Sequence, residues 1–329
     1  MSKAHNFNLI VTTGDPDGIG DEVTYKALLQ SHFAPQAIFV VMTTHPQHPL
    51  MRRLRARVVK KYSSRVYASL AAALSDNDPP VRVRFVENGA PSPLWVEEGA
   101  LACLEKKAAA LVTAPLSKTL IRDSGLHDVG HTEILARVCG VEKNAVRMAF
   151  IGQKFNVVLA TGHLPLKDVA SHVTAASLFT SLKLASEFRS CLPARTKHLP
   201  VALVALNPHA GDDQLIGKEE TTIFRDALAR AISAKLHVIG PLVPDAAFLP
   251  ENWRRFSVYV CPYHDQGLIP FKAIHGHESG AHTTLGLPII RTSVDHGTAK
   301  DLYGKNKAGS QSMLEAIAWA LRFARINRN

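Results

Sequence analysis

The chain has 329 residues, of which 46% are hydrophobic and 20% charged, and this composition is typical of a soluble globular enzyme. The first ten residues lack the apolar core of a signal peptide, and no apolar run approaches the roughly 18 residues that span a bilayer, so secretion and membrane insertion are not expected. The four cysteines lie far apart without a CxxC pair, which indicates reduced thiols and a cytoplasmic protein.

Short apolar runs alternate with amphipathic segments along the whole chain. The runs predict strands at 8–13, 37–42, 81–86, 109–113, 146–151, 156–161, 201–206, 236–239, 257–261 and 284–290. Helices are expected at 21–30, 96–107, 133–139, 175–191, 219–234 and 311–326. Such alternation favours an α/β fold whose largely parallel sheet has helices on both faces.

The formal net charge is +10. A nucleic-acid-binding role would rest on this charge alone, because the basic residues are scattered except at 51–61. That run is more typical of the solvated face of a helix than of a binding patch. An enzyme that binds phosphorylated substrates and a dinucleotide explains the charge more simply, because a positive field attracts anions.

Two loops at predicted strand ends have unusual composition. The segment 14–20, GDPDGIG, follows the first strand and precedes a helix, so its glycines permit a tight turn with backbone amides facing a ligand. An ordinary strand-to-helix turn is the alternative. The third glycine of a dinucleotide fingerprint is replaced by Val23, so a Rossmann site is only weakly indicated. The segment 113–118, TAPLSK, is the second of these strand-end loops, and it places a lysine, Lys118, there.

Three further strands each run into a histidine: His163, His209 and His264. Ligands of parallel sheets bind beyond the carboxyl ends of the strands, so these side chains can converge. Three imidazoles would hold a divalent metal and leave positions open for substrate, which is a catalytic arrangement. With 16 histidines in the chain, surface turn residues are the alternative interpretation.

Seven ordered blocks resemble the 4-hydroxythreonine-4-phosphate dehydrogenase family. They are TTGDPDGIG (12–20), TAPLSK (113–118), GHTE (130–133), TGHLPLKDV (161–169), LNPHAGDDQLIGKEE (206–220), YHDQGLIPFK (263–272) and TLGLPIIRTSVDHGTAKDL (284–302). Residues 43–93 contain no comparable block. The family is similar in fold to isocitrate and isopropylmalate dehydrogenases, with two α/β subdomains around a cleft. The resemblance therefore implies a first subdomain of residues 1–125 and 285–329, and a second of residues 126–284 that carries the metal ligands.

The resemblance also implies roles for individual residues. The metal ligands are His163, His209 and His264, and the metal is zinc, magnesium, manganese or cobalt. Substrate contacts are His131, Thr132, Lys272, His282 and Arg291. The catalytic candidates are Lys272 and Asp265, where Asp265 is either the base or a residue that orients an imidazole. The dinucleotide, NAD or NADP, is expected near Asp295, His296, Gly297 and Thr298. The family is a homodimer whose active sites are each completed across the interface.

The family reaction oxidises 4-phosphooxy-L-threonine, and the product decarboxylates on the way to pyridoxal phosphate. Three positions depart from the family pattern: Asp17 replaces a common alanine, Tyr303 a small residue, and His282 an asparagine that touches substrate. His282 leaves open a related dehydrogenase of four-carbon sugar-acid phosphates or of an aromatic dihydrodiol. A metal-dependent hydrolase is a rival from another class, because a three-histidine site also activates water.

Overall fold

A computed structural model describes residues 7–30, 37–78, 81–276 and 279–327. The chain forms two compact units. The first comprises Met1–Lys143, Glu278–His282 and Leu287–Asn329, and the second Asn144–His277 and Thr283–Gly286. Residues 126–143 therefore pack with the first unit, although the expected subdomain boundary lay at residue 125. Independent domain behaviour of the two units stays a prediction.

The first unit contains a parallel sheet. Its strands in spatial order are β3 (Ser64–Tyr67), β4 (Val83–Val86), β2 (Ala37–Met42), β1 (Phe7–Thr12), β5 (Ala110–Thr113) and β12 (Arg291–Val294). The central strands are buried apolar runs, as expected for a parallel sheet covered on both faces. Successive side chains of a strand point to opposite faces, so Leu9 and Val11 enter one core cluster and Ile10 the other.

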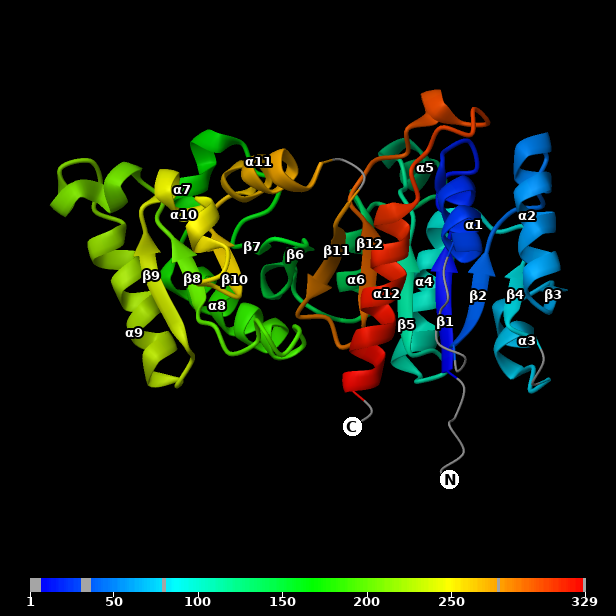
Figure 1. Cartoon of the computed structure of the whole chain (residues 1–329), viewed down its shortest axis with the longest axis horizontal. Helices are drawn as coiled ribbons and strands as arrows, with labels where there is room; N and C mark the ends of the chain where they lie inside the picture. The colour runs from blue at the N-terminus through cyan, green and yellow to red at the C-terminus, as the bar shows by residue number, and fades with distance from the viewer. Residues whose placement is uncertain (1–6, 31–36, 79–80, 277–278, 328–329) are drawn as a thin grey trace. The chain divides into compact units, whose positions relative to one another are not determined.

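Helices cover both faces of this sheet (Figure 1). The core cluster on one face contains residues of α1 (Gly20–Gln30), α2 (Pro49–Lys61) and α12 (Gln311–Ile326). The cluster on the other face contains residues of α3 (Leu70–Ser75), α4 (Ser92–Leu104), α5 (Lys118–Asp123) and α6 (His131–Val138). The prediction of an α/β unit with a parallel sheet is confirmed.

The strand order places a topological switch point between β1 and β5. From β1 the chain moves outward to β2 and beyond, and then returns to add β5 on the other side of β1. Loops diverge at such a point, and ligands of open α/β sheets bind there, beyond the carboxyl ends of the strands. The loops that follow β1 and β5 begin with Thr13 and Ala114, so they flank this position.

The second unit has a mixed sheet. Its order is β6 (Arg147–Ile151), β7 (Asn156–Leu159), β10 (Val258–Cys261), β8 (Val201–Val204) and β9 (Val238–Leu242). Only the β6–β7 pair is antiparallel among the pairings described for this unit. Strand β11 (Ala281–Leu285) is divided between the two units.

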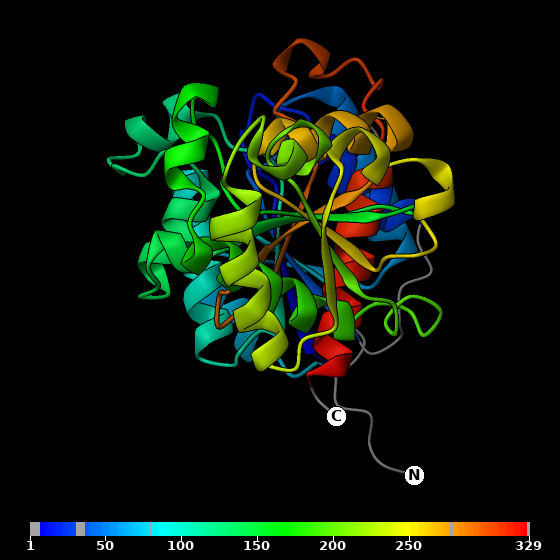
Figure 2. The ribbon, with the colours of Figure 1, turned by 90° about the vertical axis from the view of Figure 1, so that its left-hand side faces the viewer.

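Helices of the second unit pack against β7, β8, β9 and β10 (Figures 1 and 2). Helix α11 (His264–His275) contacts β7 and β10, α8 (Ala175–Ser190) contacts β7, β8 and β10, and α9 (Arg225–Ser233) contacts β9. The core beneath α11 is rich in aromatic rings, including Phe155, Tyr259 and Phe271. The unit also contains short helical segments: α7 (Val169–His172), α10 (Pro244–Ala247), and turns at Leu166–Asp168, Pro208–Gln214, Glu220–Phe224 and Pro250–Asn252. A further turn at Lys143–Ala145 lies where the first unit passes into the second.

Several elements differ from the sequence-based expectation. The predicted strand at 284–290 is wrong, because β11 ends at Leu285 and Gly286, with φ of +88°, turns the chain before β12. The expected elements also lack strands β3 and β12, helices α3, α5, α7, α10 and α11, and the full extent of α2. No helix in the described ranges is long and apolar enough to cross a membrane, and no disulfide joins the four cysteines in the described structure.

Candidate active site

In the second unit, histidines follow three neighbouring parallel strands. Strand β10 pairs in parallel with β7 and with β8, so the carboxyl ends of all three lie at one edge of the sheet. His163 follows β7 and His264 begins α11 directly after β10. The two imidazole rings lie together, with 5.0 Å between their centroids. The edge therefore presents two nitrogen-donor side chains side by side.

Asp265 contacts one of these rings. His264 Nδ1 lies 2.7 Å from Asp265 Oδ1. A carboxylate at Nδ1 holds the proton on that nitrogen and leaves Nε2 as the metal-binding or proton-accepting atom. Of the two roles expected for Asp265, this hydrogen bond favours orientation of the imidazole.

His209 lies in a loop with unusual backbone geometry. All six residues from His209 to Gln214 have positive φ, between 43° and 84°. L-residues adopt this left-handed region at a cost, so surrounding contacts must maintain the conformation. The buried Glu220 carboxylate supplies them by accepting hydrogen bonds from the Leu206 and Asn207 backbone amides and from Asn207 Nδ2, at 2.8–2.9 Å.

The donor set of the second unit suits a divalent metal, although one chain does not gather all three expected ligands. Within the described residues no group of three or more histidine, cysteine, aspartate or glutamate side chains is arranged to hold a metal ion. His163 and His264 are adjacent imidazoles, the ligand type that zinc prefers. His209 is not part of their group, so its role as third ligand stays a prediction.

In the first unit, Arg291 lies buried at the start of β12. Its Nε and Nη2 atoms donate to Thr113 Oγ1, at 3.2 Å and 2.7 Å, and Nη1 donates to His282 Nδ1 at 2.9 Å. Because Nδ1 accepts, the neutral His282 ring carries its proton on Nε2 and offers a donor there. Burial lowers the pKa of Arg291 to about 9, so the guanidinium remains charged at neutral pH. The cluster presents donors and positive charge, which suits an anionic group.

His131 begins α6 near this guanidinium. Burial, and secondarily the charge of Arg291, lower the pKa of His131 to about 3, while a hydrogen bond to the backbone of Ala114 partly opposes the shift. Its Nε2 atom is buried and has no hydrogen-bond partner among the residues that the structure describes. His131 is therefore a neutral hydrogen-bonding group and a poor base at neutral pH. Its neighbour Thr132 is also on α6 and is partly buried.

The loop after β12 contains the expected dinucleotide contacts. The Asp295 backbone amide donates to Ser312 Oγ at 2.9 Å, and His296 Nδ1 lies 2.9 Å from its neighbour's carbonyl, Gly297 O. A Cβ atom at Gly297 would meet nothing within 4 Å, so a ligand can approach this backbone closely. The Ile19 amide donates to Thr298 O at 3.0 Å, which joins this loop to the glycine-containing loop after β1.

The glycine-containing loop packs tightly on its neighbour. Gly14 has φ of +72°, and a Cβ there would lie 2.1 Å from Pro115 O, so only glycine fits. The loop is therefore fixed against the 113–118 segment, where Ser117 caps α5 through its side chain and Lys118 is the first helical residue. Lys272, the remaining predicted substrate contact, is on helix α11 of the second unit, and its side chain is partly buried.

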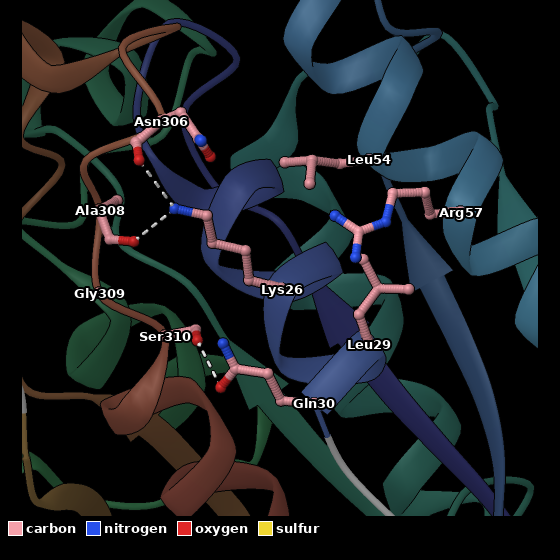
Figure 3. A pocket seen from close by; sticks show the side chains of 9 residues that line it. All are labelled: Lys26, Leu29, Gln30, Leu54, Arg57, Asn306, Ala308, Gly309 and Ser310. Carbon is pink, nitrogen blue, oxygen red and sulfur yellow. Dashed lines mark hydrogen bonds between the residues drawn. The ribbon is translucent and has the colours of Figure 1, made fainter.

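A pocket of about 340 Å³ lies between α1, α2 and residues 306–310 (Figure 3), and none of the predicted site residues lines it. Lys26 turns its ammonium group toward the carbonyls of Asn306 and Ala308, at 3.3 Å and 2.8 Å, and toward Glu22 at 2.6 Å. All three of its donors are therefore used within the protein. The pocket does not coincide with the candidate active site.

Sequence reasoning missed the residues that support the site. Asp15, Thr113, Glu220 and Lys300 fix loops or site side chains, yet none was singled out. Glu220 lies within the 206–220 block and in the first turn of the helix predicted at 219–234, and this position was the available signal. The contacts of Asp15 and Thr113 depend on residues far away in the chain.

Comparison with known proteins identifies the family of the chain. A family model described as pyridoxal phosphate biosynthetic protein PdxA matches residues 42–320. A 4-hydroxythreonine-4-phosphate dehydrogenase of Sulfurihydrogenibium sp. is 35% identical, over 97% of this chain and 99% of that protein. The chain belongs to this family. The predicted resemblance is confirmed, and the match runs through residues 43–93, where no block was recognised.

Solved structures extend the relationship to the fold. A putative 4-hydroxythreonine-4-phosphate dehydrogenase from Salmonella typhimurium has a TM-score of 0.79 and 29% identity, covering 97% of this PdxA-family chain and all of that one. A β-decarboxylating dehydrogenase from Thermococcus kodakarensis has a TM-score of 0.50 at 13% identity, over 98% of this chain and 89% of that one, and shows the fold alone. A putative D-threonate 4-phosphate dehydrogenase of Bradyrhizobium diazoefficiens is 33% identical, over 98% of each chain.

Proposed function

We propose that this PdxA-family chain uses NAD to oxidise the C3 hydroxyl of 4-phosphooxy-L-threonine. The product, 2-amino-3-oxo-4-phosphooxybutyrate, decarboxylates to 3-amino-2-oxopropyl phosphate in pyridoxal 5′-phosphate biosynthesis. The observation that carries the proposal is the relationship to 4-hydroxythreonine-4-phosphate dehydrogenases over almost the whole chain. The buried cation and donors at Arg291 and His282 support an anionic substrate.

Each site residue has a proposed task. Arg291, Lys272 and the Nε2–H group of His282 hold the anionic groups, and orientation by these contacts brings C3 into position. His131 and Thr132 contact the substrate as neutral hydrogen-bonding groups. The candidates for the base that accepts the hydroxyl proton are Asp265 and Lys272, of which Lys272 would serve only as a neutral amine and not as an anion-binding cation. The low pKa of His131 makes that residue unsuitable.

His163, His209 and His264 would hold a divalent metal, zinc, magnesium, manganese or cobalt. When bound there, such an ion polarises the C3 oxygen and stabilises the negative charge that develops during decarboxylation. Asp265 holds the proton on His264 Nδ1 and so orients the Nε2 atom. His163 and His264 lie together while His209 is not part of their group, which supports a homodimer in which His209 of a second copy completes the site.

The dinucleotide is proposed to bind at Asp295, His296, Gly297 and Thr298, with NADP as the alternative to NAD. The open space at Gly297 supports this placement. A cytoplasmic location is proposed from the four cysteines, which form no disulfide in the described structure.

A second candidate is a dehydrogenase of four-carbon sugar-acid phosphates. Two observations favour it: the relative named a putative D-threonate 4-phosphate dehydrogenase, and His282 beside Arg291. Imidazole Nδ1 has one lone pair, which Arg291 uses, whereas an asparagine oxygen would keep a second lone pair available. A metal-dependent hydrolase would need no dinucleotide, so NADH formation separates it from both dehydrogenases.

The first experiment mixes the purified protein and zinc or magnesium with NAD and 4-phosphooxy-L-threonine, and follows NADH absorbance. NADH should form, and its formation should stop after chelation of the metal.

His163→Ala should lower kcat by more than about 100-fold and lower the amount of metal bound per chain, because one ligand is lost. His198→Ala, at an exposed histidine of the same unit, is the matched control. Undiminished turnover by metal-free His163→Ala protein would exclude the metal role, and NADH formation with threonate 4-phosphate alone would favour the second candidate.

A further inference from the structure

Three loops of the first unit meet at one buried carboxylate. The Asp15 backbone amide donates to Pro115 O at 3.1 Å, and its Oδ1 accepts from the Ser117 amide at 2.9 Å. Its Oδ2 forms an ion pair with Lys300 Nζ at 3.1 Å. The three loops follow β1, β5 and β12, so Asp15 connects the loops at the topological switch point with the loop at 295–300.

Lys300 lies between two carboxylates of very different exposure. The Asp15 side chain is fully buried, whereas that of Asp17, whose Oδ2 lies 2.9 Å from the same Nζ, is 63% exposed. An ion pair with an exposed carboxylate is weakened by solvent and salt. A buried carboxylate that loses its cation stays desolvated and uncompensated, so the Asp15 contact is the stronger constraint on Lys300.

The backbone next to Lys300 is in a conformation that needs support. Ala299 has φ of 39°, in the left-handed region that residues with a Cβ rarely occupy. The contacts on its two sides are the Ile19 amide on Thr298 O and the carboxylates on Lys300. Loss of the Lys300 contact would leave the loop free to relax toward commoner backbone angles.

We propose that Asp15 is a positioning residue for the dinucleotide: through Lys300 it holds the loop at 295–300 in the shape that binds NAD. This inference rests on the proposed function only for the identity of the ligand. Asp15 reaches the 113–118 and 295–300 loops from the turn after β1, so it sets their spacing at the sheet edge where ligands bind. A pre-ordered loop binds its ligand more tightly because no binding free energy is lost in ordering the loop.

The test compares Asp15→Asn with Asp17→Asn in the full-length protein. Asparagine at position 15 keeps an oxygen acceptor for the Ser117 amide, and its neutral NH2 group replaces the charged oxygen that holds Lys300. NADH binding is measured by fluorescence titration, and backbone amide exchange of residues 295–300 is measured without ligand. Asp15→Asn should weaken NADH binding by about 10-fold and speed exchange in this loop, whereas Asp17→Asn should change binding by less than about 2-fold.

Steady-state kinetics distinguish a positioning role of Asp15 from a general loss of folded structure. Asp15→Asn should raise KM for NAD and leave KM for the phosphorylated acid nearly unchanged. If Asp15→Asn is poorly folded, Lys300→Met tests the same contact from an exposed position, and loop exchange should rise in that variant too. Equal NADH affinity and equal loop exchange in wild type and Asp15→Asn would overturn the inference. A wild-type protein that binds NADH but oxidises neither acid would instead contradict the proposed function alone.

Discussion

His131 illustrates how one buried side chain links folding to pH. Its folded pKa is about 3, against an ordinary value of 6.5, so between these pH values the unfolded chain binds a proton that the folded chain does not. The sign follows directly: this group makes the folded state less stable as pH falls through the window. The effect of this candidate site histidine on folding stability can therefore be measured in the absence of substrate.

We predict that His131→Asn has a shallower dependence of stability on pH. The His131 contribution is at most about 1.4 kcal/mol per pH unit between pH 6.5 and 3, and the variant lacks it. Urea unfolding at intervals from pH 7 to pH 4 would measure the difference in slope. His127→Asn is the matched control, because His127 is exposed in the same unit. Identical slopes in wild type and His131→Asn would show that His131 titrates alike in the folded and unfolded states.

At the scale of elements, the loop from Asn207 to Glu220 depends on one carboxylate. Six left-handed residues lie inside the loop, and the Glu220 side chain, in a residue that is only 5% exposed, accepts hydrogen bonds at its base. Glu220 begins a short π-helical turn, Glu220–Phe224, before α9. Such turns often occur at functional sites, and this one places Glu220 next to the loop that carries His209.

We predict that Glu220→Gln loosens this loop and destabilises the fold by about 1–3 kcal/mol, because an amide nitrogen replaces an oxygen that accepts hydrogen bonds. Thermal unfolding should give a lower Tm, and amide exchange of residues 206–214 should be faster. Glu219→Gln is the comparison, since the Glu219 carboxylate accepts only one of the described hydrogen bonds, from Asn207 Nδ2. Unchanged exchange in Glu220→Gln would mean that the loop is held by other contacts.

The elements were predictable where burial makes the sequence pattern strong. β2 and β8 are continuous apolar runs, and β1 and β5 are largely apolar, because a covered parallel sheet has no polar face. The same rule failed at 284–290, where an apolar run continues through the turn at Gly286. The basic run on helix α2 was interpreted as a solvated helix face, but Arg55 of this run is buried, pairs with Glu87 and lies 4.3 Å from the ring centre of Phe85.

The candidate site was predictable where its residues follow strands directly. Histidines after β7, β8 and β10 can be located from the chain alone, because parallel strands end at one edge. The Thr113–Arg291 contact joins residues 178 positions apart, and no local pattern reports such a pair. The Asp15–Lys300 ion pair depends in the same way on the tertiary fold.

At the scale of the whole molecule, the charge of +10 should assist the capture of anions. We predict that kcat/KM for the phosphorylated acid falls about threefold or more between about 0.02 M and 0.3 M salt, because screening weakens long-range attraction, while kcat changes little. Steady-state kinetics over this range provide the measurement, and an uncharged viscosity agent controls for general solvent effects. A kcat/KM that does not respond to salt would mean that the surface charge has no role in substrate capture.

The outermost strands of the two units, β3 and β9, carry residues that oppose pairing with another chain. Arg65 on β3 is half exposed and pairs with Asp76 and Asp78, and Pro241 on β9 has no amide hydrogen to donate. Charges and prolines on edge strands discourage intermolecular β-pairing. We therefore expect partly folded copies to resist aggregation through these edges, and contact between copies to use side-chain surfaces rather than extension of the sheet.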